Sequence, residues 1–243
     1  MEVRVLHALE EFEQAVELQR IVWGFADLEI LPRRMFVVTD KIGGQSIGAF
    51  DDGKMIGFSI AIPALKAGGG AFLHSNMMGV LKEYRNAGVG RMLKLKQREV
   101  ALLEGIELIE WTFDPLEVKN AFFNIERLGV VIRRFVLNQY GVTTSHLHGS
   151  LPTDRCTAEW WLNSPRVNGL FAYAPVVYPP PSARISVPND IADIKASDPA
   201  KAREVQKAVS EQFLEHLGSG LAVTGFERGD DAGTYLLTPW HSN

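Results

Sequence analysis

The sequence contains a single cysteine, Cys156, and this scarcity excludes two kinds of chemistry. One thiol cannot form an internal disulfide, and no cysteine pair or cysteine–histidine cluster has the spacing of a zinc site. We therefore expect no metal. A reducing, cytoplasmic location is also expected, because the start of the chain has no apolar run typical of a signal peptide and no 18 consecutive residues are apolar.

Positive charge is also scarce, because 25 Lys and Arg stand against 29 Asp and Glu, a net charge of -4. General binding to nucleic acid or to an anionic membrane needs a basic surface that neutralises phosphates. We expect neither partner. Any anion site must then be local.

The apolar residues, 46% of the chain, alternate between the periods of helices and strands and predict an α/β fold. Asp51-Asp52-Gly53 is typical of a hairpin turn between two of the strands. The first expected elements are a strand at 2–9, a helix that ends at Gly24 and a second, short helix at 32–39. They are followed by strands at 45–50, 54–63 and 71–80, a helix at 88–103, a strand at 107–113, a helix at 116–128 and a strand at 130–137. This order predicts a mixed, mostly antiparallel central sheet flanked by helices.

The last hundred residues differ from this pattern and predict a C-terminal α/β extension. A proline-rich crossing near 174–188 leads into a strand at 183–187 and a helix that begins at Asp198-Pro199 and ends at Gly218. We assign residues 1–145 to one domain and 146–243 to an extension. The roughly 60 residues beyond the crossing are too few to fold well alone, so we expect them to pack on the first domain.

The segment Arg85-Asn86-Ala87-Gly88-Val89-Gly90 lies between an expected strand and an expected helix. The first backbone N–H groups of a helix lack intrahelical acceptors, and the helix dipole makes this end attractive to anions. Glycines there remove the Cβ atoms that would hold a phosphate off. Between Lys82 and Arg98 lie six Lys or Arg and one Glu, a local charge of +5. The sequence thus predicts a phosphate site, although an ordinary helix-entry turn would also explain the glycines.

This RxxGxG pattern, with its preceding strand and following helix, resembles the pyrophosphate-binding motif of the GNAT superfamily of acyl-CoA-dependent N-acyltransferases. The predicted order of elements over residues 1 to 140 is similar to that fold as well. The P-loop and dinucleotide patterns, by contrast, are missing.

The resemblance implies how an acetyl-CoA or other acyl-CoA co-substrate would bind. The N–H groups of Asn86, Ala87, Gly88, Val89, Gly90 and Arg91 would hold the pyrophosphate, and Arg85 would support the phosphates or the loop. The main chain of Met78, Gly79 and Val80 would pair with the pantetheine amides like an added strand. Asn120 and Asn124 could bond pantetheine or simply cap and solvate their helix. Lys94, Lys96 and Arg98 are expected on a solvated helix face, with at most one reaching the 3′-phosphate.

The acceptor amine must lose a proton before it attacks a thioester, so the site needs a base. Strict alternation places His74, Asn76, Met78 and Val80 on one face of the strand 71–80. His74 is a base candidate or else a hydrogen-bonded interior histidine. Glu110 is a second candidate for the base, or else a carboxylate that is paired or lies at an edge of the sheet.

This sequence departs from the family's pattern at the position of the usual general acid. Many members have a tyrosine four residues before a Gly-aromatic pair, whereas here Ile125 precedes Gly129 and Val130 at that spacing. Tyr140 is a substitute candidate or else a packing residue at a strand end. Arg33-Arg34, in the segment expected over the acceptor groove, could receive a carboxylate or form a surface pair.

These patterns favour an N-acyltransferase that moves an acyl group, acetyl as the first choice, from acyl-CoA to a small-molecule or peptide amine. A non-catalytic acyl-CoA-binding or regulatory module on the same fold is the alternative that Ile125 motivates. A third reading is a site for another phosphate ligand. A homodimer is left open.

Overall fold

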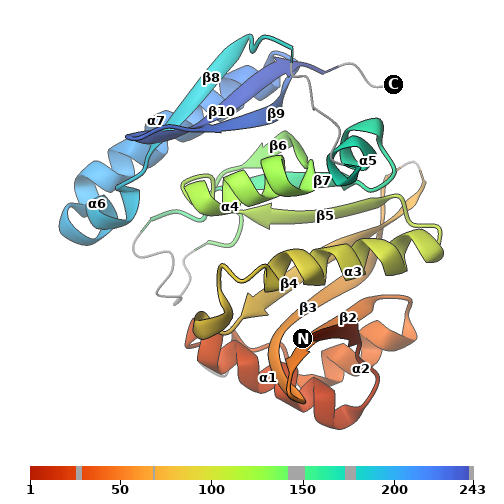
Figure 1. Ribbon diagram of the computed structural model, residues 1–243. Helices are drawn as coiled ribbons and strands as arrows, with labels where there is room; N and C mark the ends of the chain where they lie inside the picture. Colours follow the sequence, from red (N-terminus) through yellow and green to blue (C-terminus); the bar gives the residue numbers. More distant parts are fainter. Residues whose placement is uncertain (26–28, 68, 142–150, 173–178, 241–243) are drawn as a thin grey trace. The chain divides into compact units, whose positions relative to one another are not determined.

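The computed structural model describes residues 1–25, 29–67, 69–141, 151–172 and 179–240 (Figure 1). The chain divides into two compact units within one strand, so that Glu110 belongs to the first unit and Trp111 to the second. Among the helices in these ranges, none is long and apolar enough to cross a membrane.

The first unit is a sheet with strand order β1-β2-β3-β4-β5, in which all neighbours up to β4 are antiparallel and β4 pairs with β5 in parallel. Its elements are β1 (Glu2–Val5), α1 (Leu9–Trp23), α2 (Arg33–Lys41), β2 (Gln45–Asp51), β3 (Lys54–Leu65), β4 (Ala71–Val80), a 3₁₀ turn (Lys82–Tyr84), α3 (Val89–Leu103) and β5 (Leu108–Phe113). The predicted order of the first unit is confirmed.

Helices cover both faces of this sheet. On one face, Phe58 of β3 meets Trp23 of α1 edge-on at 6.0 Å between ring centroids and Phe36 of α2 at 6.1 Å. On the other face, an added Cβ at Gly57 would lie 3.4 Å from Leu93 of α3. Since Gly57 and Phe58 are adjacent in a strand, their side chains point to opposite faces. We call these the α1 face and the α3 face.

β4 contains a β-bulge at Asn76. Ile60 of β3 pairs with Met77 and Ala61 pairs with Ser75, so Asn76 has no residue opposite it. An extra residue in one strand reverses the alternation beyond it. The expectation that His74 shares a face with Met78 and Val80 is therefore wrong, because strict alternation ignored the bulge.

The bulge sorts the β4 side chains between the two faces. Through their β3 partners, Leu73, Ser75, Met78 and Val80 belong to the α3 face. His74, paired with Ile62, lies on the α1 face with Met77 and Gly79.

The second unit has the strand order β5-β7-β6-β9-β10-β8, and the pairs β6–β7, β6–β9, β9–β10 and β8–β10 are antiparallel. Its further elements are α4 (Val118–Phe122) continued by a π-helix (Phe123–Arg127), β6 (Val131–Val136), β7 (Arg155–Trp161), α5 (Pro165–Phe171), β8 (Ala183–Pro188), α6 (Ile191–Ser197), α7 (Pro199–Gly218), β9 (Leu221–Arg228) and β10 (Ala232–Pro239). The mixed, mostly antiparallel sheet with flanking helices is confirmed.

Aromatic packing holds the second unit together. Phe213 of α7 stacks on Phe135 of β6 at 4.9 Å and meets Tyr235 of β10 at 5.0 Å between centroids. Tyr235 is fully buried, and its hydroxyl donates to the Pro115 carbonyl at 2.7 Å. Trp160 of β7 is also fully buried and donates its indole N–H to the Leu128 carbonyl at 2.7 Å. Each buried polar tip thus has a partner, as burial requires.

The predicted boundary at residue 145 lies outside the described residues, as do residues 174–178 of the proline-rich crossing. The extension contains more structure than the predicted strand and helix. Its last part is the antiparallel hairpin β9–β10, and α5 and α6 were not predicted.

Candidate functional site

We call the turn between β4 and α3 together with the first residues of the helix, 85–91, the cradle. Asn86 has a φ of 65° and Gly88 a φ of 83°, and α3 begins directly afterwards at Val89. The Met92 N–H donates to the Gly88 carbonyl at 3.0 Å, the spacing of a helical hydrogen bond. The N–H groups before Met92 therefore lie in the first turn of the helix. Left-handed residues in such a turn direct successive N–H groups toward one concave point.

Three glycines lie in this turn or in the strand and helix beside it, and each has a different structural environment. Gly88 is required by its positive φ, which strains other residues. Gly79 is required by packing, since an added Cβ would lie 2.8 Å from the Trp23 ring. Gly90 has neither requirement, because its Cβ would meet only Met78 Cε, at 3.6 Å. A ligand that approaches the helix start closely would explain why position 90 has no side chain.

The charged side chains of the turn are exposed or partly exposed. The Arg85 guanidinium donates from Nε to the Val80 carbonyl at 3.2 Å, which fits its expected role in supporting the loop. Asn86, Ala87 and Gly88 are exposed, whereas Val89 is buried in the first unit's core and anchors the helix start.

β4 and β5 are paired along only a short part of β4. In the described ladder, β5 pairs with β4 at Leu73 and His74, opposite Ile109 and Glu110. β4 continues for six more residues, to Val80. The peptide groups of Met78 to Val80 therefore lie beyond this parallel ladder, on the strand that leads to the cradle.

The two base candidates lie directly opposite each other. His74 and Glu110 are register partners in the parallel ladder, so both side chains lie on the α1 face. Lys66, which follows β3, places its ammonium 3.3 Å from Glu110 Oε1. Sequence analysis did not find Lys66, because nothing local to its segment indicates a carboxylate partner from β5.

The imidazole of His74 is held toward its neutral form. Burial lowers the pKa of His74 below its ordinary value, the Glu110 carboxylate opposes this shift, and the Lys94 charge adds to it. A histidine that is neutral at pH 7 can accept a proton, as a general base must.

Lys94 of α3 is buried, and the expectation that it lies on a solvated face is wrong. Its side chain is 3% exposed, and Nζ donates to Ser75 Oγ and to Gln97 Oε1, each at 2.9 Å. Burial lowers the pKa of Lys94 to about 7. Its helical spacing to the buried residues Gln97 and Ala101, three and seven positions on, is the signal that could have found it.

Three further candidates belong to the second unit. Asn120 of α4 is exposed, whereas Asn124 is 1% exposed and its amide nitrogen has no hydrogen-bond partner among the described residues. Asn124 lies in the π-helix, a geometry frequent at functional sites. Tyr140 is 51% exposed, and its hydroxyl lies 2.7 Å from Thr112 Oγ1. The binding and acid roles of these residues stay predictions.

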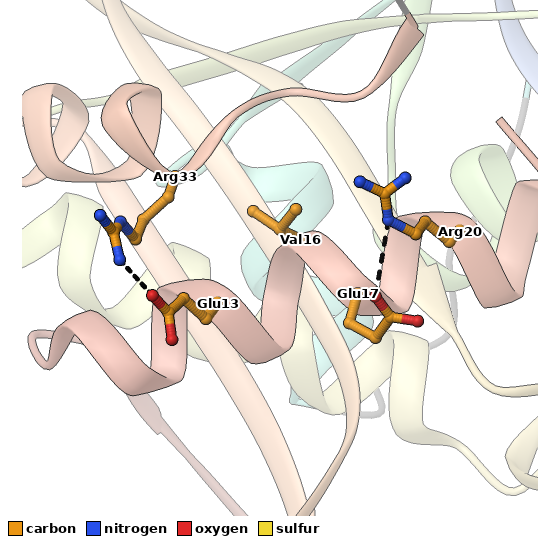
Figure 2. Close-up of a pocket in the computed structure, with 5 residues that line it drawn as sticks. All are labelled: Glu13, Val16, Glu17, Arg20 and Arg33. Atoms are coloured by element: carbon orange, nitrogen blue, oxygen red, sulfur yellow. Dashed lines mark hydrogen bonds and ion pairs between the residues drawn. The ribbon is translucent and has the colours of Figure 1, made fainter. Parts of the chain in front are cut away.

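A hollow of about 430 Å³ lies on α1 and the start of α2, and it is lined by Glu13, Val16, Glu17, Arg20 and Arg33 (Figure 2). Its charges satisfy one another, since Arg33 pairs with Glu13 and the Arg20 Nε lies 3.5 Å from Glu17 Oε2. The pair formed by Arg33 fits a surface ion pair better than a carboxylate receptor. Within the described ranges, no cluster of three or more His, Cys, Asp or Glu could hold a metal.

Replacing the buried lysine by an apolar side chain of similar length should stabilise the protein. Between pH 7 and about 10.5 the unfolded chain keeps the Lys94 proton while the folded protein releases it, so wild-type stability rises with pH in this window. We expect Lys94→Met to raise the free energy of unfolding at pH 6 by about 1–4 kcal/mol. Urea unfolding should show this gain shrinking as the pH rises toward 10.

Lys96→Met is the matched control on the same helix, because Lys96 is partly exposed and pairs with Glu99. It should change stability by less than about 1 kcal/mol at every pH. A Lys94→Met variant that is less stable than wild type at pH 6 would contradict the burial argument.

Comparisons with known proteins bear on the fold. No protein-family model and no curated protein matches the chain. Solved structures do match. The ribosomal-protein-S18-alanine N-acetyltransferase from Escherichia coli is 15% identical, with a TM-score of 0.54 over 67% of this chain and 94% of that chain.

Two further structures agree with it. Naa20 from Chaetomium thermophilum, in complex with a bisubstrate analogue, is 16% identical, with a TM-score of 0.51 over 65% of this chain and 85% of that one. A putative acetyltransferase of the GNAT family from Desulfovibrio desulfuricans is 14% identical, with a TM-score of 0.51 over 66% and 98%. At these identities the likeness shows the fold alone. The protein has the GNAT fold, as the resemblance of its RxxGxG segment to the motif of that superfamily predicted.

Proposed function

We propose that the protein is an acyl-CoA-dependent N-acyltransferase that moves an acyl group, acetyl as the first choice, to an amine. The observation that carries the proposal is the start of α3, where two left-handed residues precede the first turn of the helix and Gly90 leaves space beside it. A helix start with this backbone fits a diphosphate ligand. The fold likeness to N-acetyltransferases, one of them with a bisubstrate analogue bound, supports the same class of donor.

In this proposal the protein holds the donor with main-chain groups. The N–H groups of Asn86 to Arg91 bind the pyrophosphate, and the helix dipole adds about half a positive charge at that point. The peptide groups of Met78 to Val80 bind the pantetheine amides as an added strand would.

The base acts on the acceptor amine. An alkylamine with a pKa of ~10.4 is mostly protonated at pH 7, and reaching its neutral form costs roughly 5 kcal/mol. His74, which its partial burial holds toward the neutral form, takes this proton, and the Glu110 carboxylate opposite it stabilises the imidazolium that forms. A β4 peptide N–H beside the bulge would donate to the oxyanion of the tetrahedral intermediate.

The acceptor is a small-molecule or peptide amine. Structural neighbours include an enzyme named for a ribosomal-protein alanine and an aminoglycoside 6'-acetyltransferase, so both classes are supported.

A non-catalytic acyl-CoA-binding module is the second candidate, because Ile125 stands where the usual tyrosine acid would be. CoA release from acetyl-CoA over a broad panel of amines separates the two functions. Binding without turnover would favour the module.

A carboxylate at position 90 should abolish CoA binding. Gly90→Glu places a negative charge in the cradle, and like charges in close contact cost several kcal/mol, so we expect CoA affinity to fall about 100-fold or more. Calorimetric titration with CoA measures this. Gly88 is a poorer choice because its φ of 83° would strain any replacement.

Gly169→Glu is the control, since a Cβ there meets nothing within 4 Å and its φ is not positive. It should bind CoA as wild type does. Equal CoA affinity of Gly90→Glu and wild type would refute the cradle assignment.

The pH dependence of kcat/KM should identify the base. If His74 is the base, activity falls as the pH drops through the lowered pKa of His74. Glu110→Gln removes the carboxylate that raises this pKa, so the acid limb should move to lower pH. Comparing variants with one acceptor amine cancels the titration of the amine itself.

His74→Gln should remove that limb and lower kcat/KM by about 100-fold or more. The imidazole shift of His74, followed by NMR, gives the same pKa without turnover. Loss of activity at every pH in Glu110→Gln, with His74→Gln still active, would instead assign the base to Glu110.

A further inference from the structure

Lys94 occupies an unfavourable position that the fold alone does not explain. A lysine that is 3% exposed stabilises the protein less than an apolar residue of its size would, because its ammonium has left water. Its ammonium donates to two neutral groups, the hydroxyl of Ser75 and the amide oxygen of Gln97. Its head group is nevertheless held at a defined point behind β4.

That point adjoins the proposed donor site. Ser75 follows His74, the last β4 residue paired with β5, and precedes the bulged Asn76. Its side chain lies on the α3 face, the face of the helix that carries the cradle. From Val80 back to Asn76 β4 spans about 14 Å at ~3.4 Å per residue, a length that an extended pantetheine arm can cover.

An arm that starts at the cradle and pairs with Met78 to Val80 therefore ends near Ser75. Its sulfur would lie beside the Ser75 hydroxyl, where the parallel ladder between β4 and β5 ends. A departing thiolate needs a proton there. The position of the usual tyrosine is Ile125, which has no proton to give.

We propose that the Ser75–Lys94 pair protonates the departing CoA thiolate, an inference that rests on the proposed acyl transfer. As the C–S bond of the tetrahedral intermediate breaks, the electron pair goes to sulfur. The Ser75 hydroxyl gives its proton to the sulfur and takes one from the Lys94 ammonium. Lys94 then regains a proton from solvent. The amine nitrogen loses two protons, one to the base before the attack and one to solvent from the tetrahedral intermediate, so the reaction releases one proton net for each protonated amine acylated.

The protonation state of Lys94 suits this task. Its pKa of about 7 leaves roughly half of the lysines charged at neutral pH, and a thiol has a pKa of ~8.5, so transfer to the thiolate is downhill. The ionisable groups coupled to this region are His74 on β4 and, through it, Glu110 on β5, with Lys66 beside Glu110. Activity limited by this acid falls as the pH rises above about 7.

The test compares two donors that differ only at the leaving atom. Acetyl-CoA leaves as a thiolate, whereas its selenoester analogue leaves as the less basic selenolate and depends less on a proton. With acetyl-CoA, Lys94→Met and Ser75→Ala should each lower kcat by about 100-fold. With the selenoester, the kcat of each variant should fall by less than about tenfold. The CoA affinity of both variants should stay within about twofold of the wild-type value.

Lys54→Met, a substitution of an exposed lysine at the start of β3, is the control and should leave kcat unchanged. The alkaline limb of kcat with acetyl-CoA should be present in wild type and absent in Lys94→Met. Ser75→Ala decides the question if Lys94→Met does not fold.

Equal losses with both donors would show a structural role for Lys94 and overturn the proposal. Wild-type kcat in both variants would overturn it as well. Wild-type protein that binds CoA but turns over neither donor would instead refute the acyl transfer itself, so the two failures are distinguishable.

Discussion

The single extra residue in β4, Asn76, is the constraint on which the proposed site depends. A regular strand would place Met78 and Val80 on the face of His74. The bulge reverses this order, so that Ser75, Met78 and Val80 all belong to the α3 face and His74 stays on the α1 face. The strand can therefore present a donor-binding stretch toward the helix start that follows it, while its base candidate faces the opposite helices.

The burial of Lys94 shows how stability and the proposed chemistry oppose each other. An apolar side chain at this position would pack against β4 without any loss of hydration. The lysine instead keeps a proton that it releases near neutral pH, at a point fixed by two hydrogen bonds of 2.9 Å. Residues that destabilise a fold and have strongly perturbed pKa values are concentrated at functional sites, and this makes Lys94 more informative than the partly exposed Lys96 of the same helix.

Features that depend on residues close together in the sequence could be predicted from the sequence alone. The φ of Gly88, the helix that follows it and the order of the first unit's elements follow from short patterns of glycine and apolar residues. The bulge at Asn76 could not be read in this way, because it is defined by hydrogen bonding to β3 and alternation within β4 alone gives the opposite face for Met78. The Lys66–Glu110 ion pair likewise depends on elements that are distant in sequence.

The two proposed proton routes lie on opposite faces of β4, and this separation limits the mechanism. In hydrolases with a Ser-His pair, one histidine takes a proton from the nucleophile and gives it to the leaving group. Here His74 and Glu110 face the side of α1, whereas Ser75 and Lys94 face the side of α3, so one group cannot perform both transfers. Such an arrangement suits direct attack, in which the amine and the thiolate occupy different sides of the reacting carbon and no acyl-enzyme forms.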